Sequence, residues 1–284
     1  MTTPPFRGQH RTAGPAVRQD GHLDDGRPDV HEHGGVLGTF TLITLTVAGA
    51  LYVTGAVGQR RRGDEAWPHL RTVSWIVGLL AVASVLVGPL GHAGNHDLVT
   101  HVLGHVVIGM VAPLLLVLGA PVTLARRTLD PVPAKRLGRL VGGWPTRALA
   151  FPVVAGVLDL GSVWLLYTGP VAGDSTRDPA LHSVVMLWFL VVGLLLTGSV
   201  LGLAPGRLPT EALRGALLLA AVVVPGVVAV VMSRQGVPGL ADDPTVQPAA
   251  AALAVGAVLT ALALAAVVVL PRVRARRADP VATV

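Results

Sequence analysis

The stretch PAAAALAVGAVLTALALAAVVVL, residues 248–270, decides the class of fold because it contains no charged residue. A helix that crosses the hydrocarbon core of a bilayer needs about 20 consecutive, mainly apolar residues. Backbone amides in hydrocarbon must also form their hydrogen bonds within their own segment. This stretch is therefore predicted to be a membrane-spanning α-helix.

Six further stretches of the same kind precede it in the chain. They cover residues 36–58, 70–90, 98–120, 148–169, 181–203 and 212–233. The composition agrees, since 52% of the residues are apolar and only 13% are charged, whereas about a quarter are charged in soluble proteins. The sequence therefore predicts an all-α, polytopic transmembrane bundle of about seven spans, formed by residues 36–270 as one domain.

The basic residues alternate between the connections of these predicted spans. Sixteen of the 22 Lys and Arg residues lie in or beside the connections after the first, third and fifth spans and in the C-terminal segment. The remaining six lie in the other set, which is the N-terminal segment and the connections after the second, fourth and sixth spans. The positive-inside rule places the first set in the cytoplasm. The N-terminus is then outside. Residues 1–35, which are polar and rich in Pro and Gly, are expected to form a disordered extracytoplasmic tail, and residues 271–284 a basic cytoplasmic tail.

The same distribution bears on partners. A pI of about 11.1 can indicate a nucleic-acid-binding protein, but such proteins gather their basic residues on a folded soluble face. Here the basic residues are spread over membrane connections, so membrane lipid and not nucleic acid is the expected partner.

Nine of the ten histidines fall at or near the predicted outer face, and only His69 lies inside. The nine are His10, His22, His31, His33, His92, His96, His101, His105 and His182. Imidazole is the commonest metal ligand in proteins. The chain has no cysteine, which excludes thiolate metal sites, disulfides and haem attached through a Cys-x-x-Cys-His motif.

The third predicted span opens with the most promising pair. His101 and His105 are four residues apart, so their rings project from one face of a helix and can share a ligand. Asp97 lies one turn earlier on the same stripe, where its carboxylate could hold the second ring nitrogen of His101. Asn95 is the expected N-cap. The alternative is that these histidines simply lie at the wet end of a helix.

The fifth predicted span supplies a second face. His182 and Met186 are also four residues apart, and a set of His and Met without Cys suits Cu(I). The predicted copper ligands are therefore His101, His105, His182 and Met186; the alternative for Met186 is apolar filling, the usual role of a methionine in a membrane helix. Asp159, in the fourth span, could belong to a proton path or could form a structural hydrogen bond.

Several motifs resemble one known family. They are Leu51-Tyr52-Val53-Thr54-Gly55, then Arg60-Arg61-Arg62-Gly63 with Ala66-Trp67-Pro68, and the block His101-Val-Leu-Gly-His105 followed by Ala112-Pro113 and Leu118-Gly119-Ala120-Pro121. They are similar to the CtaG-type cytochrome c oxidase assembly factors of bacteria. The resemblance implies a seven-span protein of the plasma membrane, a terminal oxidase subunit as partner, and His101 and His105 as the family's paired histidines.

The sequence also departs from the family's pattern. The run Met186-Leu187-Trp188-Phe189 stands where the family has a His-x-His-Phe-like stretch, and Gly202-Leu203-Ala204-Pro205 lacks the acid of a Gly-x-Asp-Pro-like motif. A histidine that is common in the family's sixth helix is missing. These differences favour weaker metal binding, the use of Met186, or a changed role.

Three functions fit these observations. The resemblance favours a non-enzymatic assembly factor that delivers copper, and no nucleophile–base pair or phosphate-binding loop points to an enzyme. The alternatives are a haem-binding membrane cytochrome, with His101 or His105 and His182 as axial ligands, and a proton-coupled transporter that uses Asp159 and the histidines.

Overall fold

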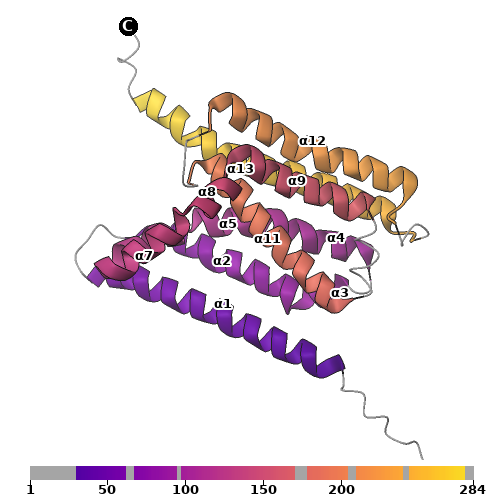
Figure 1. Cartoon of the computed structure of the whole chain (residues 1–284). Coiled ribbons are helices and arrows are strands. Elements are labelled where there is room, and N and C mark those ends of the chain that lie inside the picture. Colours follow the sequence, from indigo (N-terminus) through magenta and orange to yellow (C-terminus); the bar gives the residue numbers. More distant parts are fainter. Residues whose placement is uncertain are drawn as a thin grey trace, which may run out of the picture.

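The computed structural model describes residues 30–61, 67–94, 97–169, 178–203, 209–238 and 243–278. Within these ranges the regular structure is entirely helical, so the all-α prediction is confirmed. The long helices lie side by side in a bundle (Figure 1). The elements are α1 Val30–Arg61, α2 His69–Leu86, α3 Pro89–Gly94, α4 Leu98–Val106, η1 Val107–Val111, α5 Ala112–Leu118, α6 Pro121–Thr128, α7 Pro131–Val141, α8 Trp144–Leu149, α9 Pro152–Thr168, α11 Pro179–Leu201, α12 Glu211–Gln235 and α13 Val246–Ala278.

Six helical segments of the described chain are long and apolar enough to cross a membrane. They are Gly38–Gln59, His69–Gly91, Leu98–Thr128, Ala180–Leu201, Glu211–Gln235 and Val246–Leu270. The remaining predicted span, the fourth (residues 148–169), corresponds to α9, which is apolar but only 17 residues long. At about 1.5 Å per residue it is roughly 26 Å long, slightly less than the hydrocarbon core. The chain is thus a multi-pass membrane protein close to the predicted seven spans.

The ends of the helices follow local sequence signals. The Asp178 side chain accepts hydrogen bonds from the first turn of α11, and the Thr210 hydroxyl accepts one from Leu213 N in α12, as N-cap residues do. Proline opens α6, α7, α9 and α11, where its missing N–H costs nothing. α1 begins at Val30, inside the expected tail, and α13 continues to Ala278 in the basic segment. Residues 1–29 lie outside the described ranges.

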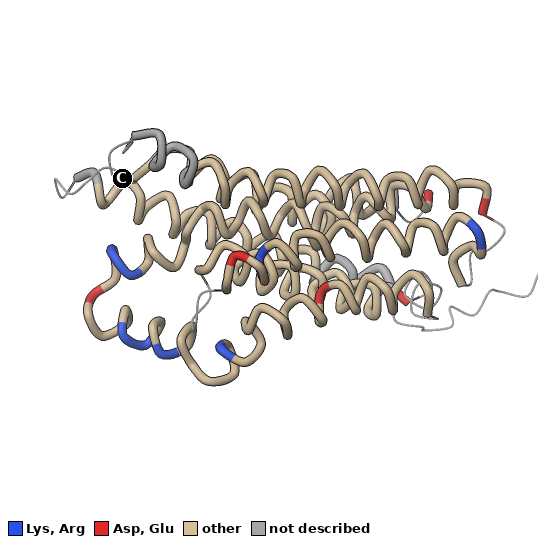
Figure 2. The backbone as a smooth tube through the Cα atoms, turned by 90° about the horizontal axis from the view of Figure 1, so that it is seen from above, with Lys and Arg blue, Asp and Glu red and all other residues tan. Residues whose placement is uncertain are grey.

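The long basic connection between the third and fourth predicted spans is largely helical. It forms α6, α7 and α8, which lie at one end of the bundle in Figure 1. Most Lys and Arg residues of the described chain gather at this end (Figure 2). The first turns of α4 and α11 lie at the opposite end, beside α3 (Figure 1). The basic residues and the start of α4 therefore lie at opposite ends of the bundle, as the sequence predicts. Which of these ends faces the cytoplasm stays a prediction.

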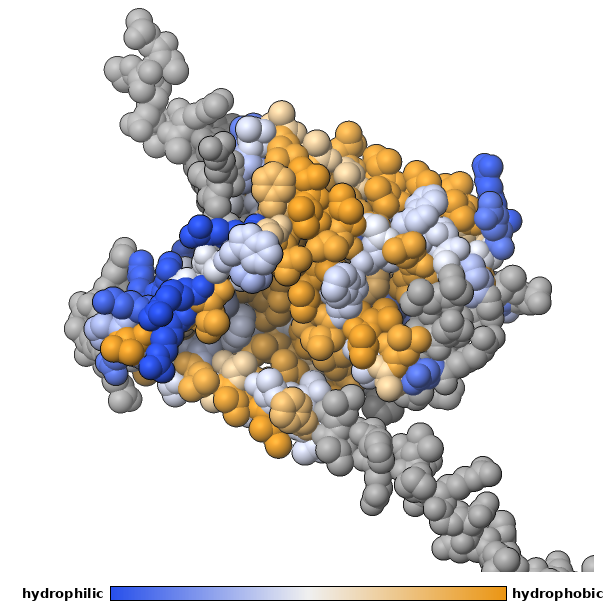
Figure 3. Space-filling model, viewed as in Figure 1, coloured by the Kyte–Doolittle hydropathy of each residue, from blue (hydrophilic) through white to orange (hydrophobic). Residues whose placement is uncertain are grey.

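The outer surface of the bundle is apolar. Large side chains such as Leu51, Leu80 and Leu219 are 68%, 63% and 65% exposed, and hydrophobic side chains form a broad band between hydrophilic ends (Figure 3). An apolar surface of this extent is unusual on a soluble protein. It is the surface that membrane lipid would contact.

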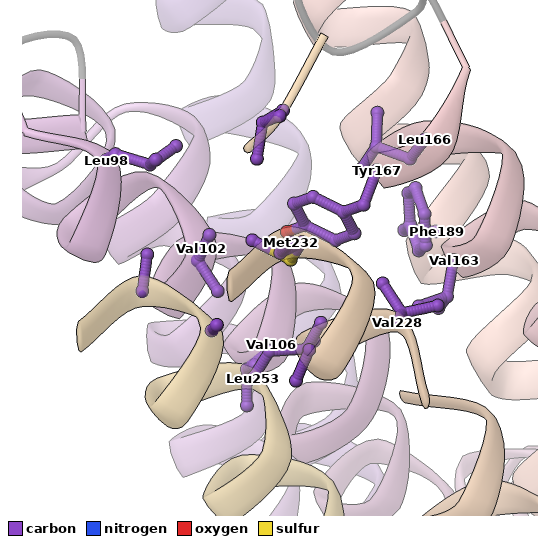
Figure 4. Close-up of a cluster of buried hydrophobic side chains, with 14 of the residues drawn as sticks. Leu98, Val102, Val106, Val163, Leu166, Tyr167, Phe189, Val228, Met232 and Leu253 are labelled. Atoms are coloured by element: carbon purple, nitrogen blue, oxygen red, sulfur yellow. The ribbon is translucent and has the colours of Figure 1, made fainter. Parts of the chain in front are cut away.

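The largest buried cluster joins α2, α4, η1, α9, α11, α12 and α13. Figure 4 shows Tyr167 of α9 and Phe189 of α11 in this cluster, together with Val102 of α4 and Met232 of α12. Val102 and Met232 are fully buried. The helix that carries the paired histidines, α4, is therefore packed into the main apolar core of the described bundle.

The third span contains an irregular segment directly after the histidines. Residues 107–111 form a π-helical turn, η1, before α5 continues. Pro113 has no N–H to offer the carbonyl four residues earlier, on Gly109, and its ring crowds that carbonyl. Gly193 of α11 packs directly against this point, because a Cβ on Gly193 would lie 2.1 Å from Gly109 O. The irregular backbone thus fits against a helix that has no side chain there.

Three of the family-like motifs meet at the basic end of the bundle. The Tyr52 hydroxyl donates a hydrogen bond to Gly119 O at 2.6 Å and accepts one from Trp67 Nε1 at 2.9 Å. Ala120 adopts a left-handed conformation with φ of 50° immediately before α6. This junction connects α1, the start of α2 and the end of α5. These motif residues therefore serve the fold at the end remote from the paired histidines.

Two guanidinium groups complete the junction around Trp67. Arg71 and Arg127 lie 5.0 and 5.8 Å from its ring centroid, within the range of cation–π attraction. Trp67 is 1% exposed. The basic residues of this end thus contribute to packing as well as to charge.

Candidate functional site

The candidate site begins at the first turn of α4. Asp97, and not Asn95 as expected, is the N-cap: its carboxylate accepts hydrogen bonds from Thr100 N at 2.9 Å and from Thr100 Oγ1 at 2.7 Å. Asn95 itself lies outside the described residues. The prediction failed because Asn and Asp are both good N-caps, so the residue types alone do not decide between two such neighbours. The hydrogen bonds from Thr100 hold the pKa of Asp97 below its usual range.

His101 and His105 project from one face of α4, as their spacing predicts. Their Nε2 atoms are 3.3 Å apart and their ring centroids 5.0 Å apart. His101 is 9% exposed and His105 4% exposed. These rings are therefore inside the bundle and not on a wet surface, which argues against the simple interfacial reading.

His182 joins this pair from a different helix. It lies in the first turn of α11, and its ring centroid is 5.0 Å from that of His101 and 6.1 Å from that of His105. The structure thus brings together three imidazoles that are up to 81 positions apart in the sequence.

The geometry of the two facing nitrogens can be compared with metal ligation. Imidazole nitrogens bind an ion such as zinc at about 2.0–2.1 Å, so two nitrogens 3.3 Å apart would subtend an angle of about 110° at a shared ion. That is the tetrahedral value. Among the described residues, however, no three or more His, Asp or Glu side chains lie close enough together to hold a metal ion without another kind of ligand.

Met186 lies next to this group. It is 3% exposed, and its methyl carbon is 4.0 Å from the position that a Cβ on Gly104 would occupy. The side chain therefore packs against α4 one residue before His105. This places the predicted thioether beside the histidines, and its role as a ligand stays a prediction, as does the role of Asp97 behind His101.

The remaining histidines are distributed differently. His69 begins α2 at the basic end, as predicted. His31, His33 and His92 lie on helix positions whose side chains are not described, and His10, His22 and His96 lie outside the described ranges.

Two neighbours of His105 were not recognised in the sequence. The rings of Phe189 and Tyr167 lie with their centroids 5.1 and 6.1 Å from that of His105, both in edge-on arrangements. With Asp159 they line a small cavity beside His105. The position of Tyr167 near the end of an apolar span was the available signal, but nothing in the sequence pairs it with His105.

Comparison with known proteins identifies relatives of the chain. The sequence profile of the cytochrome c oxidase caa3 assembly factor family (Caa3_CtaG) matches residues 50–276. An uncharacterized protein of Mycobacterium leprae is 34% identical over 183 residues, which are 61% of this chain and 28% of that protein. One of Mycobacterium bovis is 33% identical over 167 residues, 56% of this chain and 25% of that protein.

The chain thus spans about a quarter of the length of the curated relatives it matches. No solved structure is significantly similar to it. The matched range covers the positions of His101, His105, His182 and Met186 as well as those of the Tyr52–Trp67–Gly119 junction. The chain belongs to the cytochrome c oxidase caa3 assembly factor family.

Proposed function

We propose that the protein assists the assembly of cytochrome c oxidase in the bacterial plasma membrane by holding copper at the outer face before its transfer to an oxidase subunit. The observation that carries this proposal is the pair of facing Nε2 atoms of His101 and His105, 3.3 Å apart in a protein of an oxidase assembly family. The role is one of binding and transfer, and not of catalysis.

The donor set suits copper as a cargo. His101 and His105 supply two nitrogens from one helix, and His182 and Met186 of α11 would add a third nitrogen and a thioether. Thioether and imidazole ligands without thiolate favour Cu(I) over the harder divalent ions. A site with only two preformed ligands leaves coordination positions open for a ligand of the receiving protein.

The position of the site agrees with such a transfer. The histidines lie at the end of the bundle remote from α6, α7 and α8, whose arginines the positive-inside rule assigns to the cytoplasm. The copper would then be held on the outer side of the membrane, near the ends of α4 and α11.

The two alternatives have less support. A haem needs a flat space for its macrocycle next to an imidazole, whereas the cavity beside His105 has room for the centre of about one water molecule. A proton-coupled transporter would need a water-filled path that reaches Asp159. The space beside Asp159 is instead the same small cavity, which has room for about one water molecule.

Copper binding by purified protein tests the proposal. The wild type should bind near-stoichiometric Cu(I) under reducing conditions, and the double variant His101→Gln/His105→Gln should lose it. Met186→Leu should weaken Cu(I) binding more than Cu(II) binding, because it removes the thioether at nearly constant volume. His69→Ala, at the opposite end of the bundle, is the matched control and should bind like the wild type.

In cells, the double histidine variant should lower the copper content and activity of the terminal oxidase while the oxidase polypeptides still accumulate. Equal copper binding by the folded double variant and the wild type would refute the proposed site. An oxidase of normal activity after deletion of the protein would refute the assembly role.

A further inference from the structure

A small cavity adjoins the inner side of His105. Its space for the centre of a water molecule is about 10 Å³, which is close to the minimum that one water needs. The walls come from α4, η1, α9, α11 and α13. Three of the lining side chains are polar, namely His105, Asp159 and Tyr167.

Two of these polar groups have no partner within the described chain. His105 Nδ1 and the Tyr167 hydroxyl are buried and form no hydrogen bond there. Both belong to well-packed residues, which are 4% and 2% exposed. In an apolar membrane interior an unsatisfied polar group is costly, so such groups normally find a protein or water partner.

Asp159 is the third group. Its carboxyl is buried in the middle of α9, with an exposed fraction of 5%. Ser162, the partner suggested by the sequence, is engaged elsewhere: its hydroxyl donates to Leu158 O and accepts a hydrogen bond from Trp188 Nε1 at 2.7 Å. Asp159 lines the same cavity as His105 and Tyr167.

We propose that this cavity holds one water molecule that joins the Asp159 carboxyl, the Tyr167 hydroxyl and His105 Nδ1, and that this water positions the His105 ring. A buried water typically has about three hydrogen-bonding partners, and three polar side chains line this cavity. His105 Nδ1 donates its proton to the water, so Nε2 keeps its lone pair and faces His101 Nε2 at 3.3 Å.

This arrangement deepens the proposed function, on which its meaning for copper rests. Imidazoles that bind metals usually donate their second N–H to a carboxylate, a carbonyl or a water, and this contact fixes the tautomer of the ring. Asp159 is then a positioning residue that acts on His105 through the water, and Tyr167 holds the water from the other side.

The tautomer of His105 can be measured without metal. Full-length protein is labelled with ¹⁵N in its histidines and studied by NMR in lipid or detergent, where the ring nitrogen shifts report which nitrogen carries the proton. His105→Gln identifies the His105 signals. The wild type should carry the proton on Nδ1. Asp159→Leu should move a large fraction to Nε2, and Tyr167→Phe should cause a smaller shift in the same direction.

Ser162→Ala is the matched control, because it removes a polar group from the same helix outside the cavity; it should leave the His105 signals unchanged. A wild type protonated at Nε2, or an unchanged tautomer in folded Asp159→Leu, would overturn the proposal. If Asp159→Leu does not fold, Asp159→Asn, which has the same size, decides: changed His105 Nδ1 shifts support the water, and unchanged shifts overturn it.

Copper binding separates this inference from the proposed function. Where the wild type binds Cu(I), Asp159→Leu should lower the affinity by about 10–100-fold, as loss of a contact behind a metal ligand typically does. Where the wild type binds no copper, the copper proposal fails, and the NMR result still decides whether the water positions His105.

Discussion

The contact between Gly193 and Gly109 makes the sharpest prediction about the architecture of the site. In Gly193→Ala the new methyl would lie 2.1 Å from Gly109 O and 2.7 Å from Pro113 Cγ. Close carbon–oxygen contacts in proteins are about 3.3 Å or longer. Because Gly109 O and Pro113 belong to the η1–α5 backbone and its proline ring, they cannot yield as the tip of a flexible side chain can. α11 would have to move away from η1 by roughly 1 Å.

The expected cost follows from overpacking. Extra methyl groups in a well-packed interior destabilise proteins by about 1–3 kcal/mol, and a backbone contact belongs at the upper end of that range. The displacement also bears on the site, because α11 carries His182, whose ring centroid is 5.0 Å from that of His101. We therefore expect both a loss of stability and weaker copper binding in this variant.

Reversible unfolding of the purified protein in detergent measures the first effect. Gly198→Ala is the matched control, since it lies in the same helix and its added Cβ would have no atom of a neighbouring helix within 4 Å, and we expect it to be nearly neutral. A Gly193→Ala protein as stable as Gly198→Ala would show that α11 and η1 do not pack as described.

Two further predictions concern the opposite end and the orientation. Tyr52→Phe leaves Trp67 Nε1 and Gly119 O buried without the Tyr52 hydroxyl, and we expect a loss of about 1–3 kcal/mol in unfolding free energy with copper binding unchanged; an equally stable variant would contradict the junction. Reporter fusions after Arg139 and after Arg177 should report cytoplasmic and external positions respectively, because of the arginine bias between connections; the reverse pattern would place the histidines in the cytoplasm.

The sequence predicted those parts of the fold that depend on one segment at a time. Span positions follow from apolar length, as for residues 248–270, which lie within α13. The facing rings of His101 and His105 follow from helical periodicity alone. Local signals were less decisive where two residues competed, as Asn95 and Asp97 did for the N-cap, and where a polar connection could be helical, as in α7.

Only the tertiary structure decided which helices are neighbours. The meeting of His182 with His101, the close approach of Gly193 to Gly109, and the grouping of Asp159 and Tyr167 around His105 join residues far apart in the chain. Hydropathy cannot predict these contacts, because lipid is as apolar as the helix surfaces and the hydrophobic effect does not select partners within the membrane. Close packing of small residues and hydrogen bonds between helices make that selection, and both depend on the shapes of surfaces that exist only once the helices have come together.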